Sequence, residues 1–284
     1  MLWKGSEIMG KGKRIRNARE RPEKKISHGL TTDNYRLLKW TSMLTLGTGI
    51  FTAMFNDIAG MSSTAQHILK SVGYISVPLY SFLEVKAFHH TENRWKHFLK
   101  IFLLGLVSVI PFSMMVSGNP FTIEKQNACL TALIGFLCLW IADRDFRKPF
   151  EKYIHSRKFL NLISFSVNGI IAGTGVITAS FLKAENGLYA MPMLMIMNGA
   201  ENCHHKKLVQ AIALLAWCGQ MMLSKNYYAL SALLSLIPIW ILQDRDSVFQ
   251  MNDGKANHFL EVLEMIFYPA CLWGMGIAKT ILCK

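Results

Sequence analysis

The sequence predicts an all-α protein, a polytopic membrane bundle of about nine helical spans. One observation behind this prediction is a series of long apolar runs separated by short polar loops, such as residues 37–55 and 159–182. About 20 apolar residues, each rising about 1.5 Å, cover a hydrocarbon layer of roughly 30 Å. Lipid offers the backbone no hydrogen-bond partners, so such runs cross a membrane only as helices.

Positive charge gathers on alternate loops, which is the second observation. Of the 31 Lys and Arg residues, 25 fall on the side of the N-terminus in a nine-span arrangement and six on the other. Cytoplasmic loops are enriched in Lys and Arg, so this asymmetry predicts an N-terminus inside and a C-terminus outside. We expect the basic cytoplasmic face to contact anionic lipids.

The chain divides into a basic cytoplasmic arm, residues 1–36, and a single transmembrane domain, residues 37–284. The sixth span is short for a perpendicular crossing and contains Pro192, so a broken or re-entrant helix is the alternative. The nine expected spans are 37–56, 71–88, 98–116, 127–142, 159–182, 187–199, 207–223, 227–242 and 259–281.

Cysteine and histidine patterns argue against two further classes of site. The six cysteines show no paired spacing, so we expect no disulfide framework. The segments 89–90 and 203–205 contain adjacent histidines but lack the ligand spacing of a closed zinc site, and we expect no metal. The net charge of +13 comes without aromatic interleaving, so no specific nucleic acid is expected.

Two carboxylates lie at the ends of expected spans. Asp57 follows Asn56 directly after the first span, where a carboxylate must be paired, hydrated or used. A helix-end aspartate reaching water and an acid–base group in a polar cavity are both open. Glu84 ends the second span, and we expect it to pair with Arg94 or Lys96 across the bend.

Three more polar residues are candidates for a cavity. Asn127 begins the fourth span, and Tyr268 and Cys271 flank Pro269 in the last one. Proline bends a helix and frees a backbone carbonyl, which lets neighbouring side chains face a cavity. A thiol in this setting is ordinarily an inert apolar group, so a chemical role for Cys271 is the less common alternative.

Several segments together resemble the TraX family of conjugative-plasmid membrane proteins, which is linked to N-terminal acetylation of pilin. The stretch 73–84, Gly-Tyr-Ile-Ser-Val-Pro-Leu-Tyr-Ser-Phe-Leu-Glu, is similar to the family's Gly-Arg-x-x-x-Pro-Leu-Phe-x-Phe. Further similar segments are Met54-Phe-Asn-Asp-Ile58, His90-Thr-Glu-Asn93, Ile110-Pro-Phe112, Asn127-Ala-Cys-Leu130 and Phe267-Tyr-Pro-Ala-Cys-Leu272.

This chain departs from the family pattern at three positions. The family's Asp-His becomes Asn56-Asp57, its Gly-Arg becomes Gly73-Tyr74, and its final His becomes Cys271. His67 is the only histidine that the expected topology places outside. Two outcomes follow: an acetylase that uses other groups, or a copy that keeps the fold and a partner-binding role without chemistry.

The resemblance implies an acyltransferase of the bacterial inner membrane that acetylates the N-terminus of a pilin subunit, its partner, with acetyl-CoA as co-substrate. In this interpretation the catalytic residues are Asp57, Asn56, Cys271 and Tyr268. Arg94 and Lys96 would hold the phosphates of the co-substrate. Asn127 and Glu84 would complete its binding site. The alternative is a catalytically degenerate membrane scaffold or pilin-assembly factor.

Overall fold

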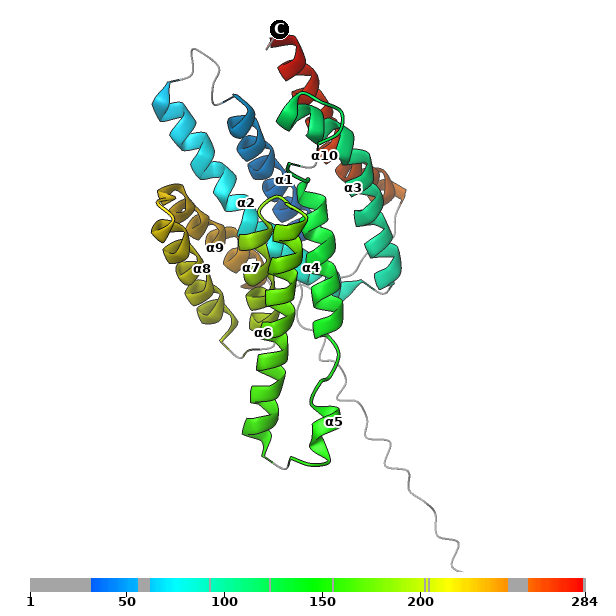
Figure 1. The fold of residues 1–284 in the computed structure, drawn as a ribbon, viewed down its shortest axis with the longest axis vertical. Helices are drawn as coiled ribbons and strands as arrows, with labels where there is room; N and C mark the ends of the chain where they lie inside the picture. The colour runs from blue at the N-terminus through cyan, green and yellow to red at the C-terminus, as the bar shows by residue number, and fades with distance from the viewer. Residues whose placement is uncertain are drawn as a thin grey trace, which may run out of the picture.

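The computed structural model describes residues 32–55, 62–244 and 255–282, apart from residues 92, 123, 155, 202 and 204. Helices make up almost all of the described chain, and no β-strand occurs within it (Figure 1). The all-α prediction is confirmed. Residues 1–31 of the expected arm lie outside the described residues, and the first helix begins at Thr32, inside the range expected for the arm.

Ten α-helices and one 3₁₀ segment follow one another within the described residues. Four of them have special features: α5 has a single turn, η1 is the 3₁₀ segment, and α4 and α7 have 15 residues each. The elements are α1 Thr32–Phe55, α2 Ser63–His90, α3 Arg94–Ser117, α4 Ala128–Ala142, α5 Lys148–Glu151, α6 Arg157–Phe181, α7 Gly187–Glu201, α8 Lys206–Leu223, η1 Tyr227–Ser235, α9 Leu236–Asp244 and α10 Lys255–Leu282.

Each of the nine expected spans coincides with a helical segment of the structure. The eighth span corresponds to η1 followed by α9, and α5 was not expected. Pro192 lies inside α7 without interrupting it, so the broken-helix alternative for the sixth span is wrong. The proline falls in the second turn of the helix, where it removes one backbone hydrogen bond near the helix start.

Successive helices run in alternating directions, so their ends gather at two opposite ends of the bundle (Figure 1). The basic end is where α2, α4 and α7 finish and where α3, α6 and α8 begin. It carries most of the described cations: Lys86, Arg94, Lys96, Lys100, Arg144, Arg147, Lys148, Lys152, Arg157, Lys158, Lys206 and Lys207. The opposite end carries Lys70, Lys125, Lys183, Lys225 and Lys279.

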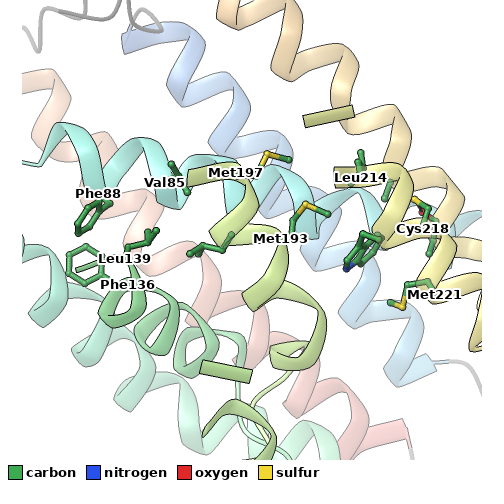
Figure 2. Packing of buried hydrophobic residues seen from close by; sticks show 13 residues of the cluster. Val85, Phe88, Phe136, Leu139, Met193, Met197, Leu214, Cys218 and Met221 are labelled. Carbon is green, nitrogen blue, oxygen red and sulfur yellow. Dashed lines mark hydrogen bonds between the residues drawn. The ribbon is translucent and has the colours of Figure 1, made fainter. Parts of the chain in front are cut away.

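The largest hydrophobic core lies where α2, α4, α7 and α8 meet. Figure 2 shows its side chains pointing toward one another from these helices. Phe88 of α2 packs edge-on against Phe136 of α4, with ring centroids 5.4 Å apart. Trp217 of α8 donates its indole N–H to the carbonyl of Tyr189 in α7. The short helix α7 is therefore a central packing element of the bundle.

Helices α1 and α2 approach closely through a pair of glycines. A Cβ built on Gly73 would lie 2.6 Å from the Cα of Gly49. Because only glycine lacks the Cβ, this crossing requires glycine at position 73, as is common where helix backbones touch. The contact aligns α2 so that its following residues, from Ser76 onward, enter the interior.

Two helices of the described chain, α3 and α6, are long and apolar enough to cross a membrane by length and composition. They differ in exposure: 33% of the most apolar stretch of α3 is buried, against 17% for α6. The outward face of α6 carries Phe165, Ile170, Ile177 and Phe181, each at least 65% exposed. Length alone also fits the core helix of a soluble protein, but such a helix is buried.

The glycine contact predicts a local loss of stability. Gly73→Ala places a methyl group against the backbone of α1, and overpacking of this kind costs about 1–3 kcal/mol. We expect the thermal unfolding midpoint of the purified protein to fall by several degrees. Gly47→Ala on the same α1 is the matched control, because nothing lies within 4 Å of its added Cβ. Equal midpoints for the two variants would contradict the close approach.

Candidate active site: a polar cluster at the centre of the bundle

Helix α2 carries two charged side chains into the interior. Glu84 and Lys86 are each only 6% exposed, within a segment where every residue from Ser81 to Lys86 is buried. Charges in such surroundings need partners, because an unpaired buried charge costs several kcal/mol. Positions two apart on a helix point to different faces, so the two charges meet different neighbours.

Glu84 faces α3. Its Oε1 lies 3.7 Å from Nε2 of His97, and its Oε2 accepts a hydrogen bond of 3.4 Å from the hydroxyl of Tyr80, one turn earlier on α2. The His97 ring packs against Phe136 of α4 at 5.1 Å between centroids. Both Glu84 Oε1 and His97 Nε2 are shielded and make no hydrogen bond within the described chain.

Lys86 faces α7 and forms a charged network at the basic end. Its ammonium donates to Oε2 of Glu201 at 2.8 Å, and Lys206 of α8 reaches the same oxygen at 3.3 Å. Glu201 lies just beyond the expected sixth span. Burial alone would raise the pKa of Glu201, but Lys86 and Lys206 outweigh it, and the pKa of this carboxyl is lowered. His89 adds a 2.8 Å hydrogen bond with Asn198 of α7.

Helix α4 begins beside the middle of α3 rather than beside its end. Asn127 is the N-cap: its Oδ1 accepts from the N–H of Leu130, and its Nδ2 donates to the carbonyl of Gly105 at 2.9 Å. Gly105 is the twelfth of 24 residues of α3. The hydroxyl of Thr131 donates to the carbonyl of Glu185 at 2.5 Å. The start of α4 is therefore enclosed within the bundle.

Tyr268 of α10 reaches the same region. Its hydroxyl is shielded and makes no hydrogen bond within the described residues, and its side chain belongs to the same buried group as Cys129. Cys129 lies in the first turn of α4, a helix that also packs against α2. We call the group Tyr80, Glu84, His97, Cys129 and Tyr268 the central polar cluster.

The composition of this cluster limits its chemistry. A carboxylate, an imidazole and two phenols exchange protons, and none of the five members is a lysine or arginine. The Cys129 side chain is buried, and apolar surroundings disfavour a nucleophilic thiolate. The arrangement therefore suits acid–base work on a substrate and does not suit covalent catalysis by Cys129.

Three residues expected from the sequence come together here. Glu84 and Tyr268 belong to the cluster, and Asn127 caps the adjacent helix. Cys271 is half-buried on α10, outside the packed group that holds Tyr268. Asn56 and Asp57 lie outside the described residues.

The expected pairing of Glu84 with Arg94 or Lys96 is wrong, because His97 takes that place. Arg94 instead pairs with Asp143 of α4 at 2.8 Å and lies 4.4 Å from the centre of the Phe88 ring. Lys96 is exposed at the start of α3. A buried carboxylate repels phosphate, so the position of Glu84 does not suit contact with the phosphates of a co-substrate.

Sequence reasoning missed Tyr80, His97 and Cys129. The four-residue spacing of Tyr80 and Glu84 indicates a shared helix face, which was a usable signal. His97 and Cys129 had no such signal in the sequence, because their neighbours come from other helices. Within the described chain, no three His, Cys, Asp or Glu side chains gather closely enough to hold a metal ion.

His67 lies apart from the cluster, 13 residues before Tyr80 or about 20 Å along α2. Its Nδ1 and the hydroxyl of Tyr228 in η1 form a 2.5 Å hydrogen bond, and the two rings stack. A shallow groove of about 250 Å³ beside it is mostly apolar. His67 is therefore too distant to replace a histidine within the central polar cluster.

The described chain is an all-helical bundle with an enclosed cluster of ionisable side chains and one basic end. The profile of the family described as TraX protein matches residues 36–253, well over half of the chain. The chain belongs to the TraX family, which makes it a conjugation-associated protein. No curated protein and no solved structure matches it.

The Lys86–Glu201–Lys206 network predicts a pH dependence of stability. Because the pKa of Glu201 is lowered in the folded state, the unfolded chain binds a proton at this carboxyl at a higher pH than the folded chain does. The network's stabilisation is present above the ordinary glutamate pKa and is lost as pH falls through the lowered value. We expect the unfolding midpoint to fall less between pH 7 and pH 4 in Glu201→Gln than in the unaltered protein. Parallel pH profiles would contradict this ion-pair account.

Proposed function

We propose that the protein is a membrane-bound acyltransferase that acetylates the N-terminus of a conjugative pilin subunit with acetyl-CoA. The observation that supports this most is the central polar cluster: a carboxylate, an imidazole and phenols enclosed where four helices meet. Acyl transfer from a thioester to an amine needs proton transfer and stabilisation of an oxyanion, both of which such groups supply. Family membership supplies the connection with conjugation.

The exposed apolar surface supports placement in a membrane. Soluble proteins rarely expose contiguous apolar patches larger than a few hundred Å². Here α3 exposes Leu103 and Leu106 at 51% and 60%, in addition to the outward face of α6. Lipid accounts for both surfaces. The alternating helix directions suit the expected nine spans, with α4 and α7, each about 22 Å long, held inside the protein.

The basic end is the cytoplasmic end in this proposal, in the bacterial inner membrane. Lys and Arg concentrate there and are sparse at the opposite end, as the positive-inside rule requires. The N-terminus then lies inside and the C-terminus outside. Anionic lipid headgroups are the expected partners of this surface.

Acetyl-CoA would approach from the basic end. Arg94 and Lys96 lie at the start of α3, within one turn of His97, and their charges suit phosphates. Arg94 is 30% exposed beside Asp143, so its guanidinium keeps donors facing outward. The thioester would then reach the central polar cluster.

Within the site, Tyr268 would steady the oxyanion. Asn127 would hold the start of α4 against α3. Asp57, next to Asn56, follows the outer end of α1, so it would guide the acceptor amine toward the site rather than contact the reacting carbon. Cys271, the proposed acyl carrier, lies outside the packed group around Tyr268.

A non-enzymatic scaffold in the conjugation apparatus is the second candidate. The observation in its favour is the face of α6 with Gly169 and Gly173, where nothing lies within 4 Å of an added Cβ. Small residues four apart permit close contact with another transmembrane helix. A scaffold needs such a face but has no use for acetyl-CoA.

Acetyl-CoA binding separates the two candidates. A ligand at 100 times its Kd that binds only the folded state adds about 2.7 kcal/mol to the free energy of unfolding. We expect acetyl-CoA to raise the unfolding midpoint of the purified protein, and Lys96→Ala to weaken this effect. Lys225→Ala at the opposite end is the control and should keep it. No effect of millimolar acetyl-CoA on the unaltered protein would favour the scaffold.

Single cysteines in a cysteine-free background test the orientation. We expect a membrane-impermeant maleimide to label Lys183→Cys from outside the inner membrane of spheroplasts, because this exposed position follows α6 at the outer end. Lys158→Cys, at the other end of the same helix, should react only after the membrane is opened. The reverse pattern would overturn the proposed orientation, and labelling of both from outside would overturn the α6 span.

A further inference from the structure

We propose that Glu84 and His97 form the acid–base pair that protonates the departing thiolate of coenzyme A. His97 is the catalytic acid, and Glu84 is the positioning residue behind it. This inference rests on the proposed function and names a residue pair to which the sequence pattern gave no such role. It also supplies a proton donor where the family's histidine positions are occupied by Asp57 and Cys271.

The two shielded atoms that face each other are the starting point. Glu84 Oε1 and His97 Nε2 are 3.7 Å apart, and neither makes a hydrogen bond within the described chain. Native proteins satisfy nearly all such atoms, so a buried orphan pair calls for an explanation, and a catalytic role is one. The gap is slightly longer than a hydrogen bond, and pairs of this kind tighten when substrate binds.

The surroundings hold both partners in place. The Glu84 side chain is 7% exposed, and Tyr80 donates to its second oxygen. The His97 ring rests on Phe136, which is fully buried. A carboxylate beside one ring nitrogen fixes the orientation of the ring, so the other nitrogen, Nδ1, is the one that exchanges a proton with substrate.

The position of the pair matches the leaving group rather than the acceptor. His97 lies one turn after Arg94, close to the basic end, and its side chain remains 24% exposed. The thiolate of coenzyme A departs toward that end, because the phosphates of the same molecule are held there. Two cations near the pair have other partners: Arg94 pairs with Asp143 and Lys86 with Glu201. Lys96, next to His97 in sequence, is exposed.

The reaction balances with these groups alone. The acceptor nitrogen attacks the thioester carbonyl carbon and the C–N bond forms. When the tetrahedral intermediate collapses, the C–S bond breaks and its electron pair stays on sulfur. The His97 imidazolium gives its proton to that sulfur, and the proton lost by the attacking amine returns to the imidazole through water. The products are the acetylated amine and the free thiol.

Leaving-group dependence tests the proposal. A thioester of an acidic aromatic thiol, S-acetyl-thionitrobenzoate, expels a thiolate that needs no proton, whereas coenzyme A needs one. With a synthetic peptide of the mature pilin N-terminus as acceptor, we expect His97→Gln to lose about 100-fold or more in kcat/KM with acetyl-CoA. The loss with the activated thioester should be less than about 10-fold.

Glu84→Gln should show the same selectivity with a smaller loss, and it serves as the second variant if His97→Gln does not fold. His205→Gln, at an exposed position of the basic end, is the matched control and should change neither rate. Equal losses with both thioesters, or no loss in either variant, would overturn the pair's role while leaving the proposed function intact. Absence of transfer by the unaltered protein would overturn both.

Discussion

The burial of Glu84 and Lys86 on one helix is the constraint around which the rest of the structure is organised. Each charge is only 6% exposed and therefore requires partners from other elements. Lys86 ties α2 to the ends of α7 and α8 through Glu201, and Glu84 draws α3 close through His97. The glycine contact between α1 and α2 fixes the approach of the same helix. One helix thus connects the charged end with the interior.

The start of α4 completes the interior. Because Asn127 is bonded to the middle of α3, the first turn of α4 brings Cys129 into the packed group that holds Tyr268. An enclosed helix start beside a shielded phenol is an arrangement that acyl transfer can use. Helices α2 and α4 therefore connect the fold with the proposed chemistry.

The fold was largely predictable from the sequence, and the site only in part. Apolar runs such as 159–182 set helix positions directly, since length and hydropathy determine them. Glu84, Asn127 and Tyr268 were recognised because polar groups within apolar runs stand out. His97 was not, because it precedes the expected third span in a basic stretch where charge is ordinary, and its partner comes from another helix. Tertiary partners of this kind have no local signature in one sequence.

The most direct test of the account is the mass of the N-terminal peptide of the cognate pilin, from cells that carry or lack this gene. The account predicts an added acetyl group that requires the gene and is reduced in cells carrying Glu84→Gln at normal protein level. A pilin N-terminus that is unmodified in both strains, with the protein present in the membrane, would contradict acyl transfer. An acetyl group present without the gene would contradict it equally.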